Sequence, residues 1–408
     1  MSLLSIKDKI RLPSDWAIVP IGKILLSSQY GTSNGNSDDG VPIIGMKNLQ
    51  DGKVNFIDLP RVSLDKEEKE KLLINDEDIL LNRTNSYDLV GKIGYIEKAC
   101  EAVFASYLVR LQVDKTKSSP KFIAMWLSSF WAEQMIKKIA TRAVSQANVN
   151  PTEFKKYCLI PIIPLPEQNA IIDLLSTWDE TIEKIKKLII AKRKLKLSEL
   201  HTLIFRNKAN SAIGTFANLV VRKANKPNSA YKALGIRSHF KGTFQRLIEE
   251  PDTVSMESLY KVKENDLIVN ITFAWEGAIA LVKKEDEACY VSHRFPTYEI
   301  KNAIAEPCFI RQLIMSNRMK YILSNISPGG AGRNRVLNKN DFLRVPIWLP
   351  DLKTQQDIGE YLGSIDKEIN LLEQILEKYK KQKRGLMQKM LTGQWRIKPE
   401  IVNKYAEM

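Results

Sequence analysis

Residues 163–189 read IPLPEQNAIIDLLSTWDETIEKIKKLI, and this stretch decides the architecture of the chain. After a proline-rich start, apolar residues recur at alternating steps of four and three: Ile171, Leu175, Trp178, Ile182, Ile185 and Ile189. This alternation is the a/d seam of a coiled coil, in which two helices bury a narrow apolar stripe against each other. The alternative is an amphipathic helix lying on its own domain, but such a helix usually needs a wider apolar stripe. The sequence therefore predicts a long helix that pairs with a second helix.

The second helix lies in the same chain, where residues 354–379 read TQQDIGEYLGSIDKEINLLEQILEKY. They repeat the seam 187 residues later, as Ile358, Leu362, Ile365, Ile369, Leu372 and Leu376. In both stretches most acids precede the bases, so antiparallel pairing brings each acidic half against a basic half, as opposite charges prefer. We expect an antiparallel coiled coil, with the basic runs 192–194 and 380–381 as solvated helix faces. A direct contact between these runs and nucleic acid is the less favoured alternative.

The repeat is not confined to the helices, because the whole chain repeats itself once. Ile21-Gly22 returns as Ile213-Gly214, and the strand-like residues 78–84 return as residues 266–272. Each half has short β-like runs and Gly/Asn turns before a proline-rich strand and a helix, which predicts an α+β fold with two pseudo-symmetric globular domains joined by the two helices. The symmetry also predicts that Leu391 lies near Ile21. The expected segments are globular 1–165, helical 166–208, globular 209–350, helical 351–393 and a tail 394–408.

Charge indicates the kind of partner. The 408 residues carry 62 Lys+Arg and 47 Asp+Glu, a net charge of +15, of which the helices hold only +2 and +1. The remaining excess favours a polyanion, with nucleic acid ahead of a membrane surface. No apolar run of about 18 residues and no secretory signal occurs. Four cysteines without a CxxC pair, and only three histidines, argue against a zinc site or disulfide framework, so we expect the cytoplasm.

The motifs of common catalysts are missing. The sequence has no GxxxxGK[ST], no GxGxxG, no HExxH and no Asn/Asp-Pro-Pro-aromatic tetrad of an amino-methyltransferase. We therefore expect no catalytic residue, no metal ligand and no cofactor in this chain. A binding and scaffolding protein is the favoured interpretation.

Candidate DNA contacts are polar loop residues that recur in both halves. Amides read adenine edges, arginine reads guanine, and hydroxyls serve bases or phosphates. The glycine-rich residues 329–335, matched by residues 145–148, allow close approach to a phosphate chain. Ordinary polar turns are the alternative interpretation. The candidates in the first half are Lys47, Asn48, Asn82, Arg83, Thr84, Asn85, Ser86, Tyr87, Gln146 and Asn148. Those in the second half are Arg237, Ser238, His239, Asn270, Thr272, Trp275, His293, Arg294, Arg333, Asn334 and Arg335. Of these, His293 and Arg294 stand opposite Tyr107 and Leu108, so any role of theirs would be specific to the second half.

This organisation resembles the specificity subunit of type I restriction–modification systems (HsdS). The resemblance is carried by residues 163–204, by residues 348–350 and 354–393, by Ile21-Gly22 and by residues 79–83, and it extends over essentially the whole chain. The Pro-Leu-Pro-Glu-Gln sequence at 164–168 is the most specific element. The second copy departs from it, because residues 351–354 (DLKT) stand before Gln355 and the glutamate is lost.

The resemblance implies a division of labour. Each globular half would be a target-recognition domain that reads one half of a split double-stranded DNA site. The helices would set the spacing and dock two methyltransferase subunits, which use S-adenosylmethionine to methylate adenine. Motor and endonuclease subunits would bring ATP and magnesium. Two alternatives remain: a coiled-coil adaptor that does not bind DNA, and a stand-alone nuclease with a dispersed site.

Overall fold

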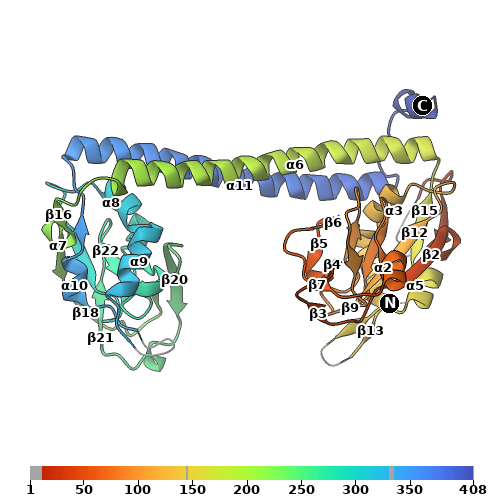
Figure 1. Ribbon diagram of the computed structural model, residues 1–408. Coiled ribbons are helices and arrows are strands. Elements are labelled where there is room, and N and C mark those ends of the chain that lie inside the picture. Colours follow the sequence, from red (N-terminus) through yellow and green to blue (C-terminus); the bar gives the residue numbers. More distant parts are fainter. Residues whose placement is uncertain (1–11, 144–145, 330–334, 408) are drawn as a thin grey trace. The chain divides into compact units, whose positions relative to one another are not determined.

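The computed structural model describes residues 12–143, 146–329 and 335–407 (Figure 1). The chain forms two compact units, residues 1–185 with 375–408, and residues 186–374. Both unit boundaries cut through the long helices, whereas the segments expected from the sequence follow chain order. The difference arises because each globular half packs with the nearby ends of both helices.

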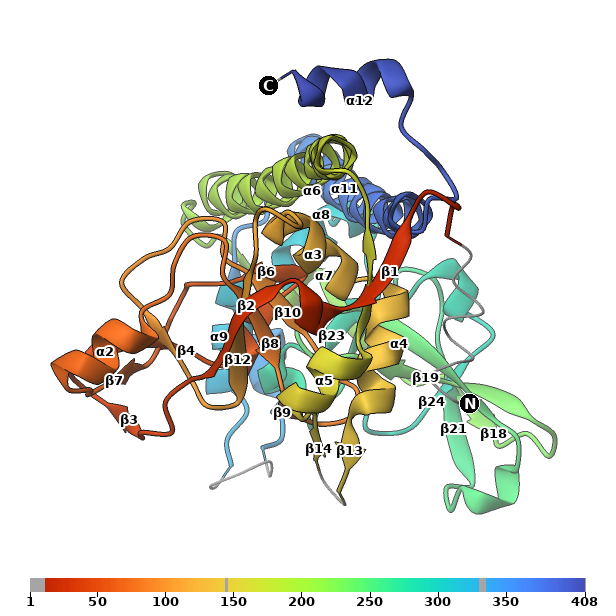
Figure 2. The same ribbon diagram turned by 90° about the vertical axis from the view of Figure 1, so that its right-hand side faces the viewer.

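The first unit is built on a six-stranded sheet in the order β2-β12-β8-β10-β6-β5 (Figure 2). Its central strand β8 (Ile79–Asn82) is buried on both faces: Ile79 and Leu81 join one apolar core and Leu80 joins another, as the two-residue period of a strand requires. The neighbours of β8 are β12 (Leu108–Val113) and β10 (Ile93–Tyr95), both antiparallel to it. This sheet fixes the end of β8, where candidate residues begin.

The other elements of the first unit surround this sheet. The four-stranded sheet β11-β4-β7-β3, the pair β1-β15 and the small sheet β13-β14-β9 complete its strands. Their bounds, with those of the remaining strands and helices, are β1 (Ala17–Pro20), η1 (Ile21–Lys23), β2 (Leu25–Tyr30), β3 (Asn36–Ser37), β4 (Val41–Ile44), η2 (Met46–Asn48), β5 (Leu49–Gln50), β6 (Gly52–Val54), β7 (Arg61–Val62), α2 (Lys66–Leu72), β9 (Thr84–Asn85), β11 (Val103–Phe104), α3 (Pro120–Leu127), α4 (Phe130–Ile139), β13 (Thr141–Arg142), β14 (Ala147–Asn148), α5 (Pro151–Tyr157) and β15 (Leu159–Ile162).

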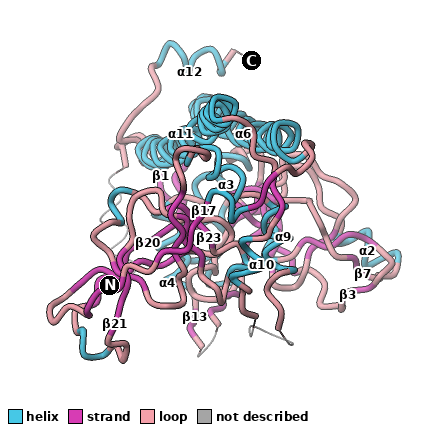
Figure 3. Tube along the Cα trace, turned by 90° about the vertical axis from the view of Figure 1, so that its left-hand side faces the viewer, coloured by secondary structure: helices cyan, strands magenta, loops and turns pink. Residues whose placement is uncertain are grey.

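The second unit holds the sheets β17-β25-β22-β23 and β18-β21-β24-β19-β20 and the pair β16-β26 (Figure 3). Its strand β22 (Leu267–Val269) is buried like β8. The remaining bounds are β16 (Ser211–Ala212), α7 (Ile213–Phe216), β17 (Ala217–Val220), β18 (Lys223–Asn225), β19 (Tyr231–Ile236), β20 (Thr243–Ile248), η4 (Pro251–Thr253), β21 (Ser258–Lys261), η5 (Ala274–Glu276), β23 (Ile279–Leu281), η6 (Lys284–Asp286), β24 (Tyr290–Val291), β25 (Thr297–Ile300), α8 (Pro307–Ile314), α9 (Asn317–Asn325), α10 (Lys339–Leu343) and β26 (Pro346–Ile347).

The two long helices are α6 (Leu165–Leu200), which continues into one π-helical turn η3 (His201–Phe205), and α11 (Leu352–Leu391). They lie side by side (Figure 1), and in the first unit the Trp178 and Tyr379 rings are 5.5 Å apart. All twelve seam residues expected from the sequence are buried or half-buried. The predicted coiled coil is thereby confirmed.

Ion pairs confirm that the helices run antiparallel. In the first unit Lys383 Nζ lies 2.6 Å from Asp179 Oδ1, and in the second unit Lys196 Nζ lies 2.5 Å from Asp366 Oδ1. In both pairs the acidic start of one helix meets the basic end of the other. In the run 192–194, Arg193 and Lys194 are exposed, as expected of a solvated face, and Lys192 and Arg193 also pair with acids of α11.

Segments from early and late in the chain come together in the first unit. Ile21 and Leu391 belong to one apolar core, as the repeat symmetry predicts. The Arg396 guanidinium lies 2.6 Å from Glu167 and 3.1 Å from Asp15, and its hydrogen bond lowers the pKa of the Asp15 carboxyl. Beyond it, α12 (Pro399–Ala406) returns toward α6 through a hydrogen bond from the Tyr405 hydroxyl to Asp173. Among the described helices, none is both long and apolar enough to cross a membrane.

Candidate nucleic-acid interface

The loop after β8 brings three distant segments of the first unit together. The backbone N–H of Arg83 donates to Tyr107 O at 2.9 Å, and Val149 N–H donates to Arg83 O at 2.7 Å. Strand β14 pairs with β9 on one side and with β13 on the other. Thr84, Asn85 and Asn148 therefore share one small sheet, and Arg83, Ser86, Tyr87 and Gln146 flank its strands.

The second unit repeats this backbone frame with other side chains. Ile271 N–H donates to Arg294 O at 3.1 Å, and Leu337 N–H donates to Ile271 O at 2.9 Å. Ile271 thus takes the place of Arg83, and Arg294 takes the place of Tyr107. The two loops therefore share these backbone hydrogen bonds but carry different side chains.

Most candidates keep side-chain surface that a ligand can reach. Among the described candidates, those exposed are Lys47, Ser86, Gln146, Asn148, Arg237, His239, His293 and Arg294, and those half-buried are Arg83, Thr84, Asn85, Tyr87, Ser238, Asn270, Thr272, Trp275 and Arg335. Arg333 and Asn334 lie outside the described residues.

Two candidates are structural, and their assignment as DNA contacts is wrong. Asn48 is buried; its Oδ1 accepts the backbone N–H of Gly45 at 2.9 Å, and its Nδ2 donates to Asn55 O at 3.1 Å. Asn82 is fully buried at the end of β8. Neither side chain can reach a base without unfolding its surroundings.

Arg335 also has an internal role. Its guanidinium donates to Ser324 O at 2.9 Å and to Ser327 O at 3.2 Å, beside the C-terminal end of α9, and lies 5.4 Å from the centre of the Trp275 ring. These contacts hold Arg335 against the C-terminal end of α9. They use one donor at Nε and one at Nη2 of the guanidinium.

A strained turn of the second unit presents Arg237 and His239. His239 and Phe240 have φ angles of 61° and 57°, in the left-handed region that costs free energy for residues with a side chain. The turn is held by His239 N–H donating to Glu276 O at 2.8 Å and by the Ser238 hydroxyl donating to the Glu276 carboxylate at 2.7 Å. Strain maintained by several contacts is typical of a site that binds a ligand.

Arg142 and Tyr30 lie beside the candidates Tyr87 and Arg83 of the first unit but were not predicted from the sequence. The Arg142 guanidinium lies 3.5 Å from the centre of the Tyr87 ring, and that of Arg83 lies 4.9 Å from the centre of the Tyr30 ring. Arg142 and Tyr30 come from β13 and β2, whose approach to the loop depends on strand pairing. The position of Arg142 three residues before the matched segment 145–148 was the only available signal.

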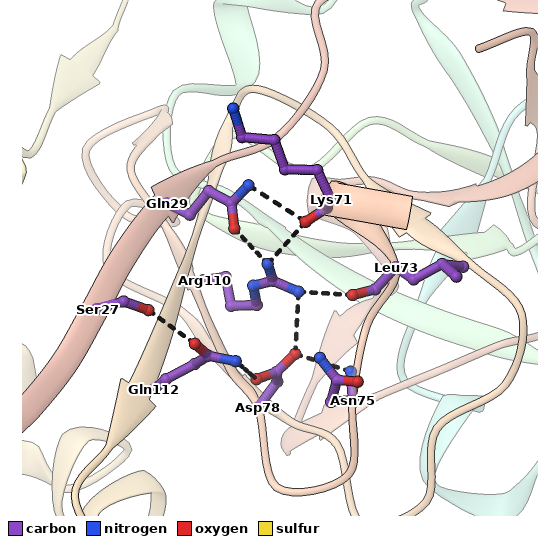
Figure 4. A network of polar contacts seen from close by, with 8 residues as sticks. All are labelled: Ser27, Gln29, Lys71, Leu73, Asn75, Asp78, Arg110 and Gln112. Carbon is purple, nitrogen blue, oxygen red and sulfur yellow. Dashed lines mark hydrogen bonds and ion pairs between the residues drawn. The ribbon is translucent and has the colours of Figure 1, made fainter. Parts of the chain in front are cut away.

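A buried ion pair stabilises the start of β8 in the first unit (Figure 4). Arg110 Nη1 lies 3.5 Å from Asp78 Oδ2 and donates to Leu73 O at 2.6 Å, while Gln112 Nε2 donates to Asp78 Oδ1 at 3.2 Å. Burial raises the pKa of the Asp78 carboxyl even though Arg110 opposes this shift. The pair anchors the strand that leads to Arg83.

The second unit has an equivalent ion pair, in which the arginine comes from a different position in the chain. Asp266 stands before β22 as Asp78 stands before β8, and it accepts two hydrogen bonds from Arg222, one of them from Nη2 at 3.1 Å. Arg222 follows β17, whereas Arg110 belongs to β12. The carboxylate therefore occupies the same position in both units, whereas the arginine comes from a different segment in each.

A sequence model of the type I restriction modification DNA specificity domain matches residues 13–192 and again residues 223–381. Each match covers one globular half and much of the long helix that follows it. The duplication expected from the sequence is therefore confirmed.

Curated relatives align over nearly the whole chain. The putative type I restriction enzyme MjaX specificity subunit of Methanocaldococcus jannaschii is 28% identical, with 95% of each chain covered. The type I restriction enzyme StySPI specificity subunit of Salmonella potsdam is 26% identical, over 96% of this chain and 93% of the relative.

Solved structures share the fold at low sequence identity. A chain from work on complex assembly and conformational transition of the type I R-M system gives a TM-score of 0.58 at 14% identity, over 93% of this chain and 98% of that one. The S subunit of the type I system of M. genitalium gives 0.53 at 15% identity, over 92% and 96%. Both likenesses agree with two mixed α/β domains joined by long helices.

Proposed function

Because the chain belongs to the family of type I restriction–modification DNA specificity subunits, we propose that each globular half reads one half of a split DNA site through the major groove. The observation that carries this proposal is the backbone frame shared by the loops after β8 and β22. It holds Arg83 and Tyr107 in one unit and Ile271 and Arg294 in the other. Because the backbone hydrogen bonds are the same and the side chains differ, each loop is suited to a different half-site.

The proposed partners of the helices are two methyltransferase subunits. Several apolar side chains of α6 and α11 lie off the pairing seam and are exposed: Leu174, Leu188, Ile190, Leu197 and Leu371. In this proposal a partner subunit buries these side chains on docking. In this proposal the partners supply S-adenosylmethionine and methylate adenine, and further motor and endonuclease subunits use ATP and magnesium. This chain contributes recognition and spacing, and acts in the cytoplasm.

Docking on the helices gives a direct prediction. Leu371→Lys should weaken binding of the methyltransferase subunits about 10- to 150-fold, the equivalent of losing one buried leucine. Leu371 is 57% exposed, so the helix content seen by circular dichroism should not change. The matched control is Asn370→Lys, which adds the same charge at the adjacent exposed position. Equal affinity of the wild type and Leu371→Lys for the partners, measured by calorimetry, contradicts docking at this surface.

The recognition role is tested by DNA binding of the complex reconstituted with its methyltransferase subunits. We expect one genomic sequence to be preferred over random duplex by about a thousandfold or more, with affinity falling steeply as salt rises. The partner subunits alone should show no such preference. Complexes that fail to bind DNA at low salt favour the adaptor alternative, and magnesium-dependent cutting by this chain alone favours the nuclease alternative.

A further inference from the structure

We propose that Arg83 reads a guanine in the half-site of the first unit, and that Asn148 and Tyr30 hold its guanidinium in position. This inference rests on the proposed function and adds the base that one reader selects. It derives from the contacts of Arg83 with two segments that lie far from it in the sequence.

Two contacts fix the plane of the Arg83 guanidinium. Arg83 Nη2 donates to Asn148 Oδ1 at 3.1 Å, and Arg83 Cζ lies 4.9 Å from the centre of the Tyr30 ring. Asn148 is itself fixed, because its backbone pairs with Thr84 in β9 and with Thr141 in β13. The guanidinium is thus oriented by one side chain at its edge and by another at its face, before any ligand binds.

The guanidinium of Arg83 can only donate hydrogen bonds. Arg83 Nε is buried and has no partner among the described residues, so Nη1 and the second hydrogen of Nη2 form the available edge. The Oδ1 atom of Asn148 uses one of its lone pairs to accept from Arg83, and its Nδ2 can donate to a ligand. A ligand that binds the free edge of Arg83 must therefore present acceptors.

Guanine satisfies this requirement better than the other bases. In the major groove guanine presents two adjacent acceptors, N7 and O6, whereas adenine places an amino donor beside N7. Cytosine presents a donor, and thymine presents one acceptor next to a methyl group. A fixed pair of guanidinium donors therefore selects guanine. Phosphate oxygens also accept two hydrogen bonds, and the experiment below separates a base from a phosphate.

The equivalent frame of the second unit lacks this device. Ile271 occupies the position of Arg83 and has no polar side chain. Arg294 stands where the first unit has Tyr107, but it is exposed, and no other described side chain holds its guanidinium. A second arginine, Arg237, is held by Thr243 O at 3.1 Å and by the Phe244 ring at 4.9 Å, but it lies in another turn of the second unit. An arginine preoriented at this position of the frame therefore belongs to the first unit.

The test compares methylation motifs written by the complete complex with its methyltransferase subunits. Arg83→Ala should reduce the preference for guanine at one position of one half-motif about 5- to 150-fold, and leave the other half-motif unchanged. Arg83→Lys should lose the same preference, because a single ammonium cannot replace two fixed donors. Asn148→Ala should lower the preference in the same direction by freeing the guanidinium. Lys138→Ala, which removes one positive charge from an exposed position of α4, is the control that should leave the motif unchanged.

A second measurement identifies the acceptor atom. Duplexes with 7-deazaguanine at that position lack N7 and should be bound more weakly by the wild-type complex. The Arg83→Ala complex should bind them as well as it binds normal guanine, because the partner of N7 is already gone. Additive losses overturn the assignment. So does an Arg83→Ala variant that weakens all sequences equally and is rescued by lysine, which indicates a phosphate contact.

Different results contradict the proposed function and the assignment of guanine to Arg83. If the wild-type complex writes no split motif, the proposed function is wrong. If it writes a split motif that the Arg83 variants leave unaltered, only the guanine assignment is wrong.

Discussion

A fragment ending at Lys208 is expected to form a two-fold dimer that, with methyltransferase partners, methylates a palindromic split site. It keeps one globular half and all of α6, whose seam residues lose their partners on α11. Burial of six apolar side chains per helix, at about 1.5–3 kcal/mol each, gives a driving force large enough to offset the entropy of association. A two-fold axis relates two identical readers, so they must read an inverted repeat.

The ion pairs of the whole chain show that this dimer is electrostatically complementary. Asp366 stands 187 residues after Asp179, and Lys383 stands 187 residues after Lys196. The Asp179–Lys383 and Lys196–Asp366 pairs are therefore two copies of one interaction. In the fragment dimer both copies become Asp179 against Lys196 of the second subunit. Ile204, which corresponds to Leu391, is placed to fill the apolar core that Leu391 fills in the full chain.

Sedimentation of the fragment should show a dimer at micromolar concentration, and Trp178→Asp should give a monomer. Trp178 is the right target because it lies on the seam and its ring contacts Tyr379 in the full chain. Thr177→Asp is the matched control, since its side chain is exposed on the same helical turn. A monomeric fragment, or one that methylates the asymmetric site of the full chain, would refute the pairing of the helices through this seam.

Removal of the buried arginine of the first unit should strongly destabilise that unit. Arg110→Ala leaves the Asp78 carboxyl buried without its cation, which typically costs about 3–5 kcal/mol. Both side chains are almost inaccessible, with 7% and 3% of their surface exposed. Urea unfolding followed by tryptophan fluorescence should report the loss, because Trp126 belongs to the core of this unit.

The control for this prediction removes both charges. Asp78→Asn with Arg110→Met keeps much of the volume and should recover a large part of the lost stability, since no buried charge remains unpaired. Arg222→Ala in the second unit should cost less, because the Arg222 side chain is 20% exposed and water can approach Asp266. If Arg110→Ala unfolds at the wild-type urea concentration, the buried pair does not anchor β8.

The two long helices could be predicted because their apolar residues recur at strict four- and three-residue steps over a long stretch. Twelve seam positions and an ordered distribution of charge specify both the pairing and its direction, and small insertions in the loops do not disturb them. The meeting of Ile21 with Leu391 followed from the repeat alone. The division into compact units did not follow, because a sequence gives chain order, whereas packing joins the start of α6 to the end of α11.

The candidate site was less predictable, for reasons visible in single residues. Asn48 and Asn82 are amides near turns, and a pattern of polar residues cannot distinguish an amide that binds its own backbone from one that faces solvent. Asn82 also continues the buried run of β8, which could have excluded it. Arg142 and Tyr30 reach the site through strand pairing between distant segments, so their spacing in the sequence gave no reason to group them.

The most direct test of two readers in one chain is the methylation pattern of host DNA. The full chain, expressed with its methyltransferase subunits in bacteria that lack adenine methylation, should produce methylated adenines in one asymmetric motif of two short specific parts separated by unspecified bases. The two parts should lie about one helical turn apart, roughly 34 Å between centres. Methylation within a single uninterrupted motif, or a pattern that the methyltransferase subunits also produce without this chain, contradicts the account.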